Sequence, residues 1–575
     1  MKKYLLIALA ALGIAACTEK IDDNSPIQKG ELEESYIAIN LMSADVETRA
    51  EDGGLEYGTD LERKITTAHF FFFDENGNPF NVVNAPATAP GGEQNHLCLD
   101  ITPITQNGDP VENVSDISNA VLILNTYKGI YPKQIVAVLN WTPTAQKSYS
   151  LSDLHLVLEG TLGNDDNGYV MSNSVYMDRA GKMVDAVPLT EANIKTSAAD
   201  AIAAPVEIYV ERTAAKVAVI SNSSAVTGNP TIFKVSSDDD LFHPIGQASG
   251  IDVYMELLGW ELYNDYSTST LLKNIENWDD DELGLDWNDS PNYRCYWAVS
   301  QSTPHSDSFS WKYEDGDKTT KGFQTNYGFN VASDADYSDR KTYTYCGENT
   351  NNGENLRTKV ILKGQLKKKE GDDTYSALEI ASWYGNEYAG VGALKVAVAN
   401  SLKYTLVYAN PEGDNYIGIE PDDLEITNLQ NIESYQVGFK LSTKGEAKEW
   451  YLRSSDGGIE FLGDMSENNN VAKTNEYLAQ QVAPALVYND GQTYYHIDIE
   501  HLGTSGKPAE FGVVRNHVYQ ISINSIKGYG SPVYNGFASI LTPPEYPEEY
   551  DDTYVAARIN VLSWKVVQQG VDIVQ

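Results

Sequence analysis

Short apolar runs of strand length recur along the chain, and they constrain its fold more than any other feature. Each run is rich in β-branched or aromatic residues, and clusters of Gly, Pro, Asn and Asp lie between the runs. This alternation of apolar runs and turn residues predicts β-strands. The main runs are residues 69–74, 120–125, 134–140, 206–211, 215–220, 252–262, 358–366, 402–408, 494–500 and 517–526. Helical periodicity is best at 271–283 and 475–486. The sequence therefore predicts an all-β fold with few short helices.

Two tandem β-sandwiches are the expected arrangement. A connector rich in Ser, Gly, Asn and Pro follows residue 220, so we predict one sandwich at 50–222 and a second at 223–541. The acidic, proline-rich stretch LTPPEYPEEYDD begins at residue 541 and should be extended and stiff. Residues 542–575 are then a linker and a tail, because two more strand-like runs close the chain.

The N-terminus has the pattern of an export signal. Two lysines precede an apolar run at residues 5–16, which is too short to span a bilayer and fits a secretory signal. Ala15 and Ala16 directly before Cys17 resemble a bacterial lipobox, in which the cysteine carries lipid (palmitate among its acyl chains) and becomes the new N-terminus. Residues 1–17 are thus predicted to be a lipoprotein signal. The alternative is an ordinary signal peptide with an incidental cysteine.

The net charge argues against nucleic acids as partners. The chain has 82 acidic and 41 basic residues, a net charge of -41. Nucleic-acid binding needs a lysine or arginine surface, so it is not expected. Adsorption to anionic membranes is disfavoured too, which leaves lipid at Cys17 as the expected membrane attachment.

Three further cysteines do not form a disulfide framework. Cys98, Cys295 and Cys346 are odd in number and widely spaced, without a C-x-x-C pair. A Cys295–Cys346 bridge is one reading, and buried free thiols are the other.

No enzyme or metal motif stands out. The eight histidines lack metal-binding spacing, and G-x-S-x-G and P-loop patterns are absent from the sequence. Asp74, Asn76 and Asn78 weakly mimic a calcium loop, but flanking strands favour a hairpin turn. Acidic runs at 279–282 and 315–317 occur readily by chance in an acidic chain. We expect no catalytic residue, metal or cofactor, although a hydrolase whose carboxylates escape notice is a weaker alternative.

A strand-like segment lies upstream of the first arginine. Ile37, Ile39 and Leu41 alternate on one face of residues 35–42. Arg49 and Ala50 follow in a polar, glycine-flanked stretch where a protease can bind an extended chain.

Five segments, in order, carry a resemblance to a known family. They are HFFFFDENGNP from residue 69, QIVAVLNWTP from 134, VEIYVERTAAKVAV from 206, YTYCGENTNNGENLRTKVILKGQL from 343 and VVRNHVYQISINSIKGYGSP from 513. Together they resemble the fimbrillins, pilin subunits of type V pili in Bacteroidales-type bacteria, whose sandwiches are transthyretin-like. Within the third segment, Arg212 and Lys216 are expected to snorkel at a strand end.

The resemblance implies an assembly route. A lipidated precursor reaches the outer membrane, and an arginine-specific protease cuts after Arg49. Removal of residues 18–49, which include the strand with Ile37, Ile39 and Leu41, leaves a groove in the first sandwich. The C-terminal strand of a neighbouring subunit fills that groove. The expected donor residues are Ile559, Val561, Trp564, Val566, Val571 and Ile573.

The same resemblance implies an extracellular fimbria built from copies of this chain and other fimbrial subunits. Its roles would be adhesion, biofilm formation and virulence, through an unknown host or bacterial receptor. Several alternatives stay open. The segment 35–42 is a permanent edge strand, the tail is the last strand of its own domain, or the chain is a tip or accessory subunit. Another alternative is a monomeric surface lipoprotein that binds glycans.

Overall fold

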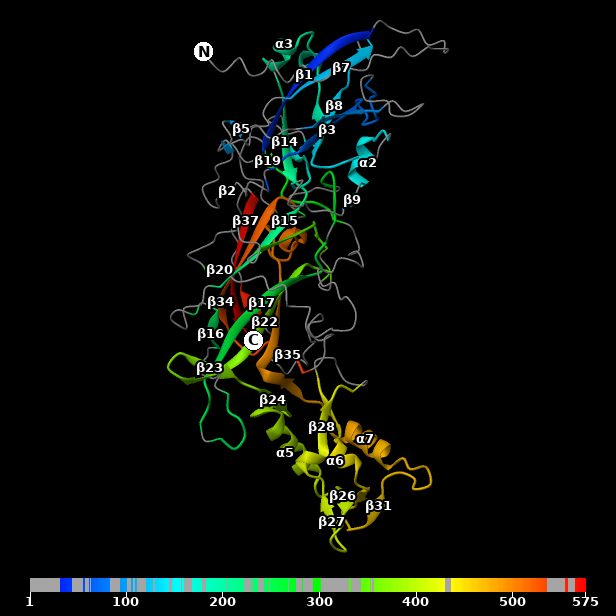
Figure 1. Ribbon diagram of the computed structural model, residues 1–575, viewed down its shortest axis with the longest axis vertical. Coiled ribbons are helices and arrows are strands. Elements are labelled where there is room, and N and C mark those ends of the chain that lie inside the picture. Colours follow the sequence, from blue (N-terminus) through cyan, green and yellow to red (C-terminus); the bar gives the residue numbers. More distant parts are fainter. Residues whose placement is uncertain are drawn as a thin grey trace.

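The computed structural model describes residues 32–43, 55–56, 62, 64–534 with internal gaps, 554–556 and 564–574. The gaps are residues 83–93, 101–104, 107–108, 111–119, 128–129, 144–146, 157, 160–167, 178–182, 204, 222–228, 230, 236–241, 248, 267, 276–281, 283–292, 301–329, 332–342, 352, 354–355 and 430–435. Figure 1 shows an elongated molecule in which three units follow one another along the long axis.

The first unit is one mixed sheet. Its strands lie in the order β4 (His96–Asp100), β3 (Thr67–Phe73), β8 (Gln134–Leu139), β10 (Met171–Asn173), β14 (Val206–Arg212), β1 (Leu32–Ser43) and β7 (Ala120–Tyr127), with β13 (Val187–Pro188) beside β8. The run of phenylalanines in β3 is buried on both faces. Phe70 and Phe72 join one apolar cluster, and Phe71 and Phe73 join another. Leu122 of β7 lies in the same cluster as Phe70, so the sheet bends and brings its two ends together.

The second unit is a sandwich of two sheets. One has the order β2 (Leu55–Glu56), β37 (Trp564–Val574), β34 (His517–Ile526), β15 (Ala215–Ser221) and β20 (Asn330–Val331), with β21 (Tyr343–Cys346) beside β15 and β36 (Tyr554–Ala556) beside β37. The other has the order β16 (Ile232–Lys234), β17 (Val253–Tyr263), β22 (Lys359–Gly371), β33 (Gln492–Asp498) and β35 (Ser531–Pro532), with β23 (Thr374–Ala377) beside β22. Val217 and Ile521 of the first sheet share a buried cluster with Trp260 and Leu362 of the second. The prediction of a mainly β protein with few short helices is confirmed.

The chain passes between these units earlier than the connector at 222 suggested. β15, which that boundary leaves in the first sandwich, pairs with β21 and β34 and contributes to the core of the second. The crossing therefore lies between Arg212 and Ala215. Composition marked the polar loop after β15, whereas the real crossing is a short buried stretch with no loop-like residues.

A third unit, here called the inserted unit, comprises residues 380–488. Its first and last strands, β24 (Ile380–Trp383) and β32 (Leu486–Tyr488), pair with each other, so the chain enters and leaves at one place. Between them lie β25 (Asn386–Tyr388), α5 (Gly390–Leu402), β26 (Leu406–Ala409), β27 (Tyr416–Gly418), β28 (Leu424–Thr427), β29 (Gly438–Leu441), α6 (Thr443–Glu446), β30 (Trp450–Arg453), β31 (Ile459–Phe461) and α7 (Asn470–Gln481). The unit has its own apolar core around Trp450 and Leu394, as inserted domains do. The predicted domain 223–541 thus holds two cores.

Short elements complete the described structure. They are α2 (Leu151–Leu156), α3 (Ala198–Ile202), β5 (Thr105–Gln106), β6 (Asp109–Pro110), β9 (Leu158–Glu159), β11 (Tyr176–Met177), β12 (Met183–Val184), β18 (Ser269–Thr270) and β19 (Tyr293–Arg294). Within the described part of the chain, no helix is long and apolar enough to cross a membrane.

The helix predictions were partly wrong. α7 covers only the first part of 475–486, because Pro484 disfavours helix at the residue before it and the chain then enters β32. Residues 402–405 end α5 and turn, so the strand predicted at 402–408 begins only at Leu406. The described start of the predicted helix 271–283 is irregular. There the Leu271 carbonyl accepts a hydrogen bond from Arg515, at 3.0 Å, in place of a helical partner.

All three described cysteines are free thiols, which rules out the Cys295–Cys346 bridge in this fold. Burial raises the pKa of Cys295 to about 12, and burial with nearby Asp265 raises the pKa of Cys346. Cys98 is exposed.

Alkylation of the native protein should therefore distinguish the three thiols. Iodoacetamide at neutral pH is expected to label Cys98 and to spare Cys295 and Cys346, because only a thiolate reacts and the buried thiols stay protonated. Peptide mass spectrometry with and without urea checks this. Failure of Cys295 and Cys346 to label in urea without reductant would reveal a disulfide.

Replacing Trp450 by Ala should loosen the inserted unit alone. Its side chain is fully buried, and such a deletion costs about 3–5 kcal/mol of unfolding free energy. Hydrogen exchange with mass spectrometry should then quicken in 380–488 and stay slow in β17 and β22. Trp260→Ala, at an equally buried position of the second sandwich, is the matched control with the opposite pattern. If either variant lowers the protection from hydrogen exchange equally in both units, the two units unfold as one.

Candidate functional site: a strand slot and a buried joint

β1 occupies a slot one strand wide. Its N-terminal part pairs antiparallel with β7, from Leu32 opposite Tyr127 to Ile39 opposite Ala120. Its C-terminal part pairs parallel with β14, from Ile39 opposite Val206 to Ser43 opposite Val210. Among the described strands β7 pairs only with β1, and β14 keeps β10 on its other side. Removing β1 would thus expose unpaired backbone groups on two facing strands.

The floor of the slot is apolar. Leu122 and Leu124 of β7 and Val206, Ile208 and Val210 of β14 are all buried in one cluster. Exposing such side chains costs roughly 1.5–3 kcal/mol each, on the order of 10 kcal/mol together. An empty slot would therefore strongly favour a replacement strand.

The expected donor strand is held within its own chain. β37 pairs parallel with β34, from His517 opposite Lys565 to Ile526 opposite Ile573, and its first residues pair with β2. β37 has 11 residues and β1 has 12, so the two strands are of matching length. Figure 1 shows β37 in the middle unit and β1 at the far end of the first.

Several predicted site residues lie outside the described residues. They are Cys17, Arg49, Ala50, Ile559 and Val561, together with most of the acidic runs at 279–282 and 315–317. For Ile37, Ile39, Leu41, Trp564, Val566, Val571 and Ile573 the structure describes the backbone pairing only.

The first two units meet at a second feature, a cluster of buried charges that we call the joint. Lys216 of β15 lies 3.0 Å from the Glu62 carboxylate, and both side chains are 0% exposed. Arg212 at the end of β14 donates through Nε to the Glu62 carbonyl at 2.8 Å. Tyr345 donates its hydroxyl to the Glu62 carboxylate. One glutamate thus ties together the ends of three strands.

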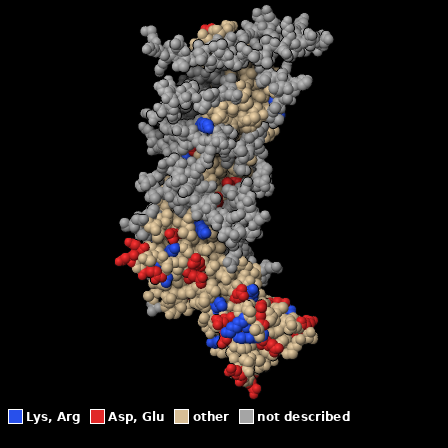
Figure 2. Space-filling model, viewed as in Figure 1, with Lys and Arg blue, Asp and Glu red and all other residues tan. Residues whose placement is uncertain are grey.

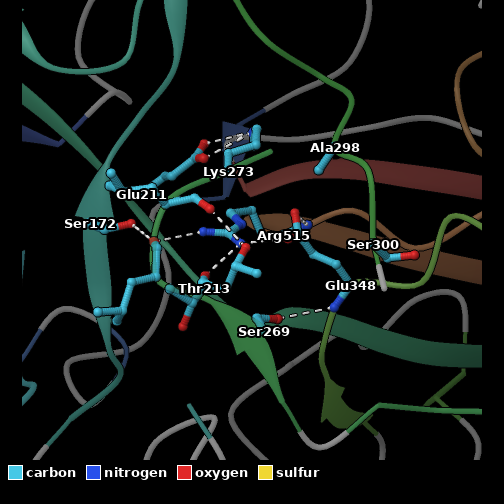
Figure 3. A network of polar contacts seen from close by, with 12 residues as sticks. Ser172, Glu211, Thr213, Ser269, Lys273, Ala298, Ser300, Glu348 and Arg515 are labelled. Carbon is cyan, nitrogen blue, oxygen red and sulfur yellow. Dashed lines mark hydrogen bonds and ion pairs between the residues drawn. The ribbon is translucent and has the colours of Figure 1, made fainter. Parts of the chain in front are cut away.

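Two more ion pairs extend the joint (Figure 3). Lys273 lies 3.0 Å from Glu211 of β14 and also donates to the Cys295 carbonyl at 2.7 Å. Arg515, just before β34, donates through Nη2 to Glu348 at 2.5 Å, and its Nη1 donates to the Leu271 carbonyl. With Arg212 and Lys216, the joint therefore holds four cations against three carboxylates.

Three of the sequence segments that carry the family resemblance contribute residues to the joint. Arg212 and Lys216 come from the third, Tyr345 and Glu348 from the fourth, and Arg515 from the fifth. The prediction that Arg212 and Lys216 snorkel was wrong. Both are buried, because Glu62 and Asn516 provide partners inside the protein.

Two groups of the joint have shifted pKa values, Arg515 and Tyr345. Burial by itself lowers the pKa of Arg515, but the adjacent Glu348 carboxylate outweighs it and the pKa is raised above its usual value. Burial and then the Glu62 carboxylate raise the pKa of Tyr345, so its hydroxyl stays a donor. Sequence reasoning missed Glu62, Glu211 and Lys273, because none of them lies in a recognisable acid–base pattern.

The calcium-like segment is a turn. Asp74 accepts from the backbone N–H groups of Asn76 and Asn78 at 2.8 and 2.9 Å, and Phe73 bridges to Pro79 across it. Across the described residues no group of three or more His, Cys, Asp or Glu side chains is placed to hold a metal ion.

Comparison with known families gives the identity of the C-terminal region. Residues 486–570 match the family described as major fimbrial subunit protein type IV, fimbrillin, C-terminal. The C-terminal region of the chain is therefore similar to that of the fimbrillins. The match runs from β32 through β33 and β34 into β37. The family that this region matches comprises major fimbrial subunits.

Solved structures give only remote likenesses to this chain. A fimbrilin from Porphyromonas gingivalis is 11% identical, with 94% of this chain and 97% of that chain covered and a TM-score of 0.32. A fimbrial assembly protein from Parabacteroides distasonis is 11% identical, with 75% and 100% covered and a TM-score of 0.27. The C-terminally truncated tip fimbrial protein of P. gingivalis is 13% identical, with 71% and 98% covered and a TM-score of 0.23. Scores this low do not define a shared fold. No curated protein matches the chain significantly.

A double-mutant cycle measures how the joint works. Lys216→Met should lower the unfolding free energy by about 3–5 kcal/mol, because it removes the cation that lies 3.0 Å from the buried Glu62 carboxylate. Adding Glu62→Gln should recover part of that loss, which urea unfolding of the two single variants and the double variant quantifies. Lys234→Met breaks the half-exposed pair with Asp252 and should cost at most about 1 kcal/mol. If Lys216→Met costs no more than that control, the joint is not a stabilising contact between the sandwiches.

Proposed function

We propose that this chain is a polymerising fimbrial subunit that exchanges strands with its neighbours. In this scheme the chain is exported as a lipoprotein anchored through Cys17 and is cut between Arg49 and Ala50. The C-terminal strand of the next subunit then replaces β1. The observation that carries the proposal is the position of β1 between β7 and β14, where one cut downstream of the strand separates it from the rest of the chain.

The energetics favour exchange once β1 has left. The donor gives up its ladder with β34 and gains a ladder with β7 and β14, so backbone hydrogen bonds are largely traded one for one. The gain comes from covering the apolar floor of the slot. Donor and acceptor are different surfaces, so the contact propagates into a filament rather than closing as a dimer.

The joint suits this scheme because it does not take part in the exchange. Glu62 lies 13 positions after Arg49 and is held by Lys216 and Arg212. The new N-terminus would stay attached there after the cut. Adhesion and biofilm formation, through other fimbrial subunits and a receptor, complete the proposal.

Cleavage followed by assembly is the test. Purified precursor treated with an arginine-specific protease should gain an N-terminus at Ala50 by mass spectrometry. It should then form ladders in unheated SDS gels and filaments in negative-stain images. Arg49→Lys should block the cut while keeping the charge, and Arg63→Lys is the matched control that leaves it intact. Deleting residues 553–575 should keep the cut and abolish the ladders.

Other outcomes contradict the proposal in distinct ways. Clean cleavage after Arg49 without assembly would indicate a tip or accessory subunit. Resistance of Arg49 to the protease in a folded precursor would favour an anchored surface lipoprotein. Ladders that persist without residues 553–575 would place the donor strand elsewhere.

A further inference from the structure

The edge of the first unit carries two histidines beside its exposed cysteine. β3 and β4 pair so that His69 lies opposite Cys98 and Phe71 lies opposite His96. Residues directly opposite each other on antiparallel strands project to the same face of the sheet, and so do residues two apart on one strand. His69, His96 and Cys98 therefore share one face. β4 is the last strand in the described order of this sheet, so Cys98 lies at its edge.

One ring nitrogen of His69 reaches the Cys98 thiol. His69 Nε2 lies 3.5 Å from Cys98 Sγ, within hydrogen-bond distance for a sulfur atom. Cys98 is exposed, whereas His69 is only 7% exposed and packs edge-on against the Trp141 ring, with centroids 6.5 Å apart. An imidazole that takes the proton of a neighbouring thiol leaves a thiolate, which is the form that attacks. The pair therefore has the composition of a nucleophile with its base.

His96 is a costly residue at its position. It is 7% exposed, and neither of its ring nitrogens has a hydrogen-bond partner among the described residues. Burial lowers the pKa of His96, so the neutral ring offers one N–H donor and one acceptor. The ring packs on Phe71, with centroids 5.0 Å apart, and a phenylalanine would do the same without burying two polar atoms. A hydrogen bond to a group from outside the chain would offset that cost.

His96 is placed to meet whatever reacts with the thiol. Its ring centroid lies 5.9 Å from that of His69. Along β4 it is two residues from Cys98, a spacing of about 7 Å, on the same face. A small reagent at the Cys98 sulfur therefore spans the distance to the His96 ring.

We propose that Cys98 is a thiol–disulfide exchange site for small disulfides, with His69 as its base and His96 as a hydrogen-bonding group for the reagent. His69 Nε2 takes the thiol proton, and the Cys98 thiolate attacks one sulfur of a disulfide R–S–S–R. The new bond to Sγ forms as the S–S bond of the reagent breaks. The leaving thiolate takes the proton from His69. The products are a mixed disulfide on Cys98 and a free thiol R–SH, so no other oxidant is needed.

Charge restricts the class of disulfide. The chain carries a net charge of -41. Figure 2 shows acidic side chains over the second and inserted units on the face that it presents. Such a charge distribution repels anions, and salt screens the repulsion. The expected reagents are therefore small disulfides without net negative charge. Hydroxyethyl disulfide is a suitable probe because it is neutral and brings hydroxyl groups for His96.

The pH dependence of mixed-disulfide formation on the uncut full chain tests the base. Hydroxyethyl disulfide is the probe, and peptide mass spectrometry measures the adduct on each cysteine. An unassisted thiol reaches half its maximal rate near about pH 8.5. Cys98 should reach half its maximal rate below about pH 7.5, and His69→Gln should return that midpoint towards about 8.5. A native midpoint of about 8.5 or higher overturns the proposal, whether or not the variant folds.

His96→Phe tests the hydrogen-bonding group separately. It should slow the reaction with hydroxyethyl disulfide about threefold or more, since one hydrogen bond to the reagent is lost. Methyl methanethiosulfonate brings no hydroxyl group, so its rate should change less than about twofold. The melting temperature should stay the same or rise, because two buried polar atoms are removed. Equal slowing with both reagents would overturn the role of His96.

Controls fix the site and the class of reagent. Cys98→Ser should remove the adduct, and His155→Gln, in α2 of the same unit, should leave the rate unchanged. The proposal is overturned if the adduct forms on Cys295 or Cys346 instead, or if His69→Gln keeps the native midpoint. Glutathione disulfide, an anion, should react more slowly and gain rate with salt. An equal rate at low salt would overturn the charge restriction. None of these results bears on strand exchange, because the chain is never cut.

Discussion

Buried charges at the joint fix how the first unit is attached to the second. Taking an ion out of water costs several kcal/mol, so apolar side chains would often hold two domains together equally well. The ion pairs add a fixed arrangement of the two units. Lys216 of the second unit is paired with Glu62, which Arg212 of the first unit also holds, and Arg212 reaches Asn516 of the second unit. These contacts form only when strands of both units are in place. A misplaced partner would leave a buried charge unpaired, so we infer that the joint specifies one arrangement. The fibre proposed above, with subunits connected at their ends, would need that stiffness.

The different roles of β14 and β7 follow from this constraint. β14 ends in Glu211 and Arg212 at the joint, while its other end forms one wall of the strand slot. The wall is therefore anchored in the charged cluster. β7, the opposite wall, has β1 as its only partner among the described strands. Exchange would thus act on one fixed edge and one edge that depends on whichever strand fills the slot.

Apolar runs of strand length predicted the strands well, because strands such as β34 and β8 are buried over continuous runs of residues. The joint could not be predicted from the sequence, since Glu62 and Lys216 are 154 positions apart and only folding brings them together. The inserted unit was missed for a different reason. α5 is rich in Ala, Val and Gly, which carry little helical periodicity, and the unit's core is built from short strands. Asn516 has a φ of 55° and turns the chain into β34. Asparagine tolerates this left-handed conformation, which the hydrophobic pattern of the sequence could not indicate.

The C-terminal strand carries a constraint on how it can enter a slot. The register shift in its ladder lies on β34, between Ile523 and Ser525, so β37 itself runs without a bulge. In a regular strand, positions 564 and 566 face one side and positions 571 and 573 the other. The predicted donor residues therefore cannot all enter one groove from β37 as it stands. Gly570 lies between the two sets, and glycine is the residue that β-bulges favour. One bulge there would bring both sets to the same face, so under the strand-exchange proposal we expect Gly570 to be the position at which the strand adjusts to a neighbour's groove.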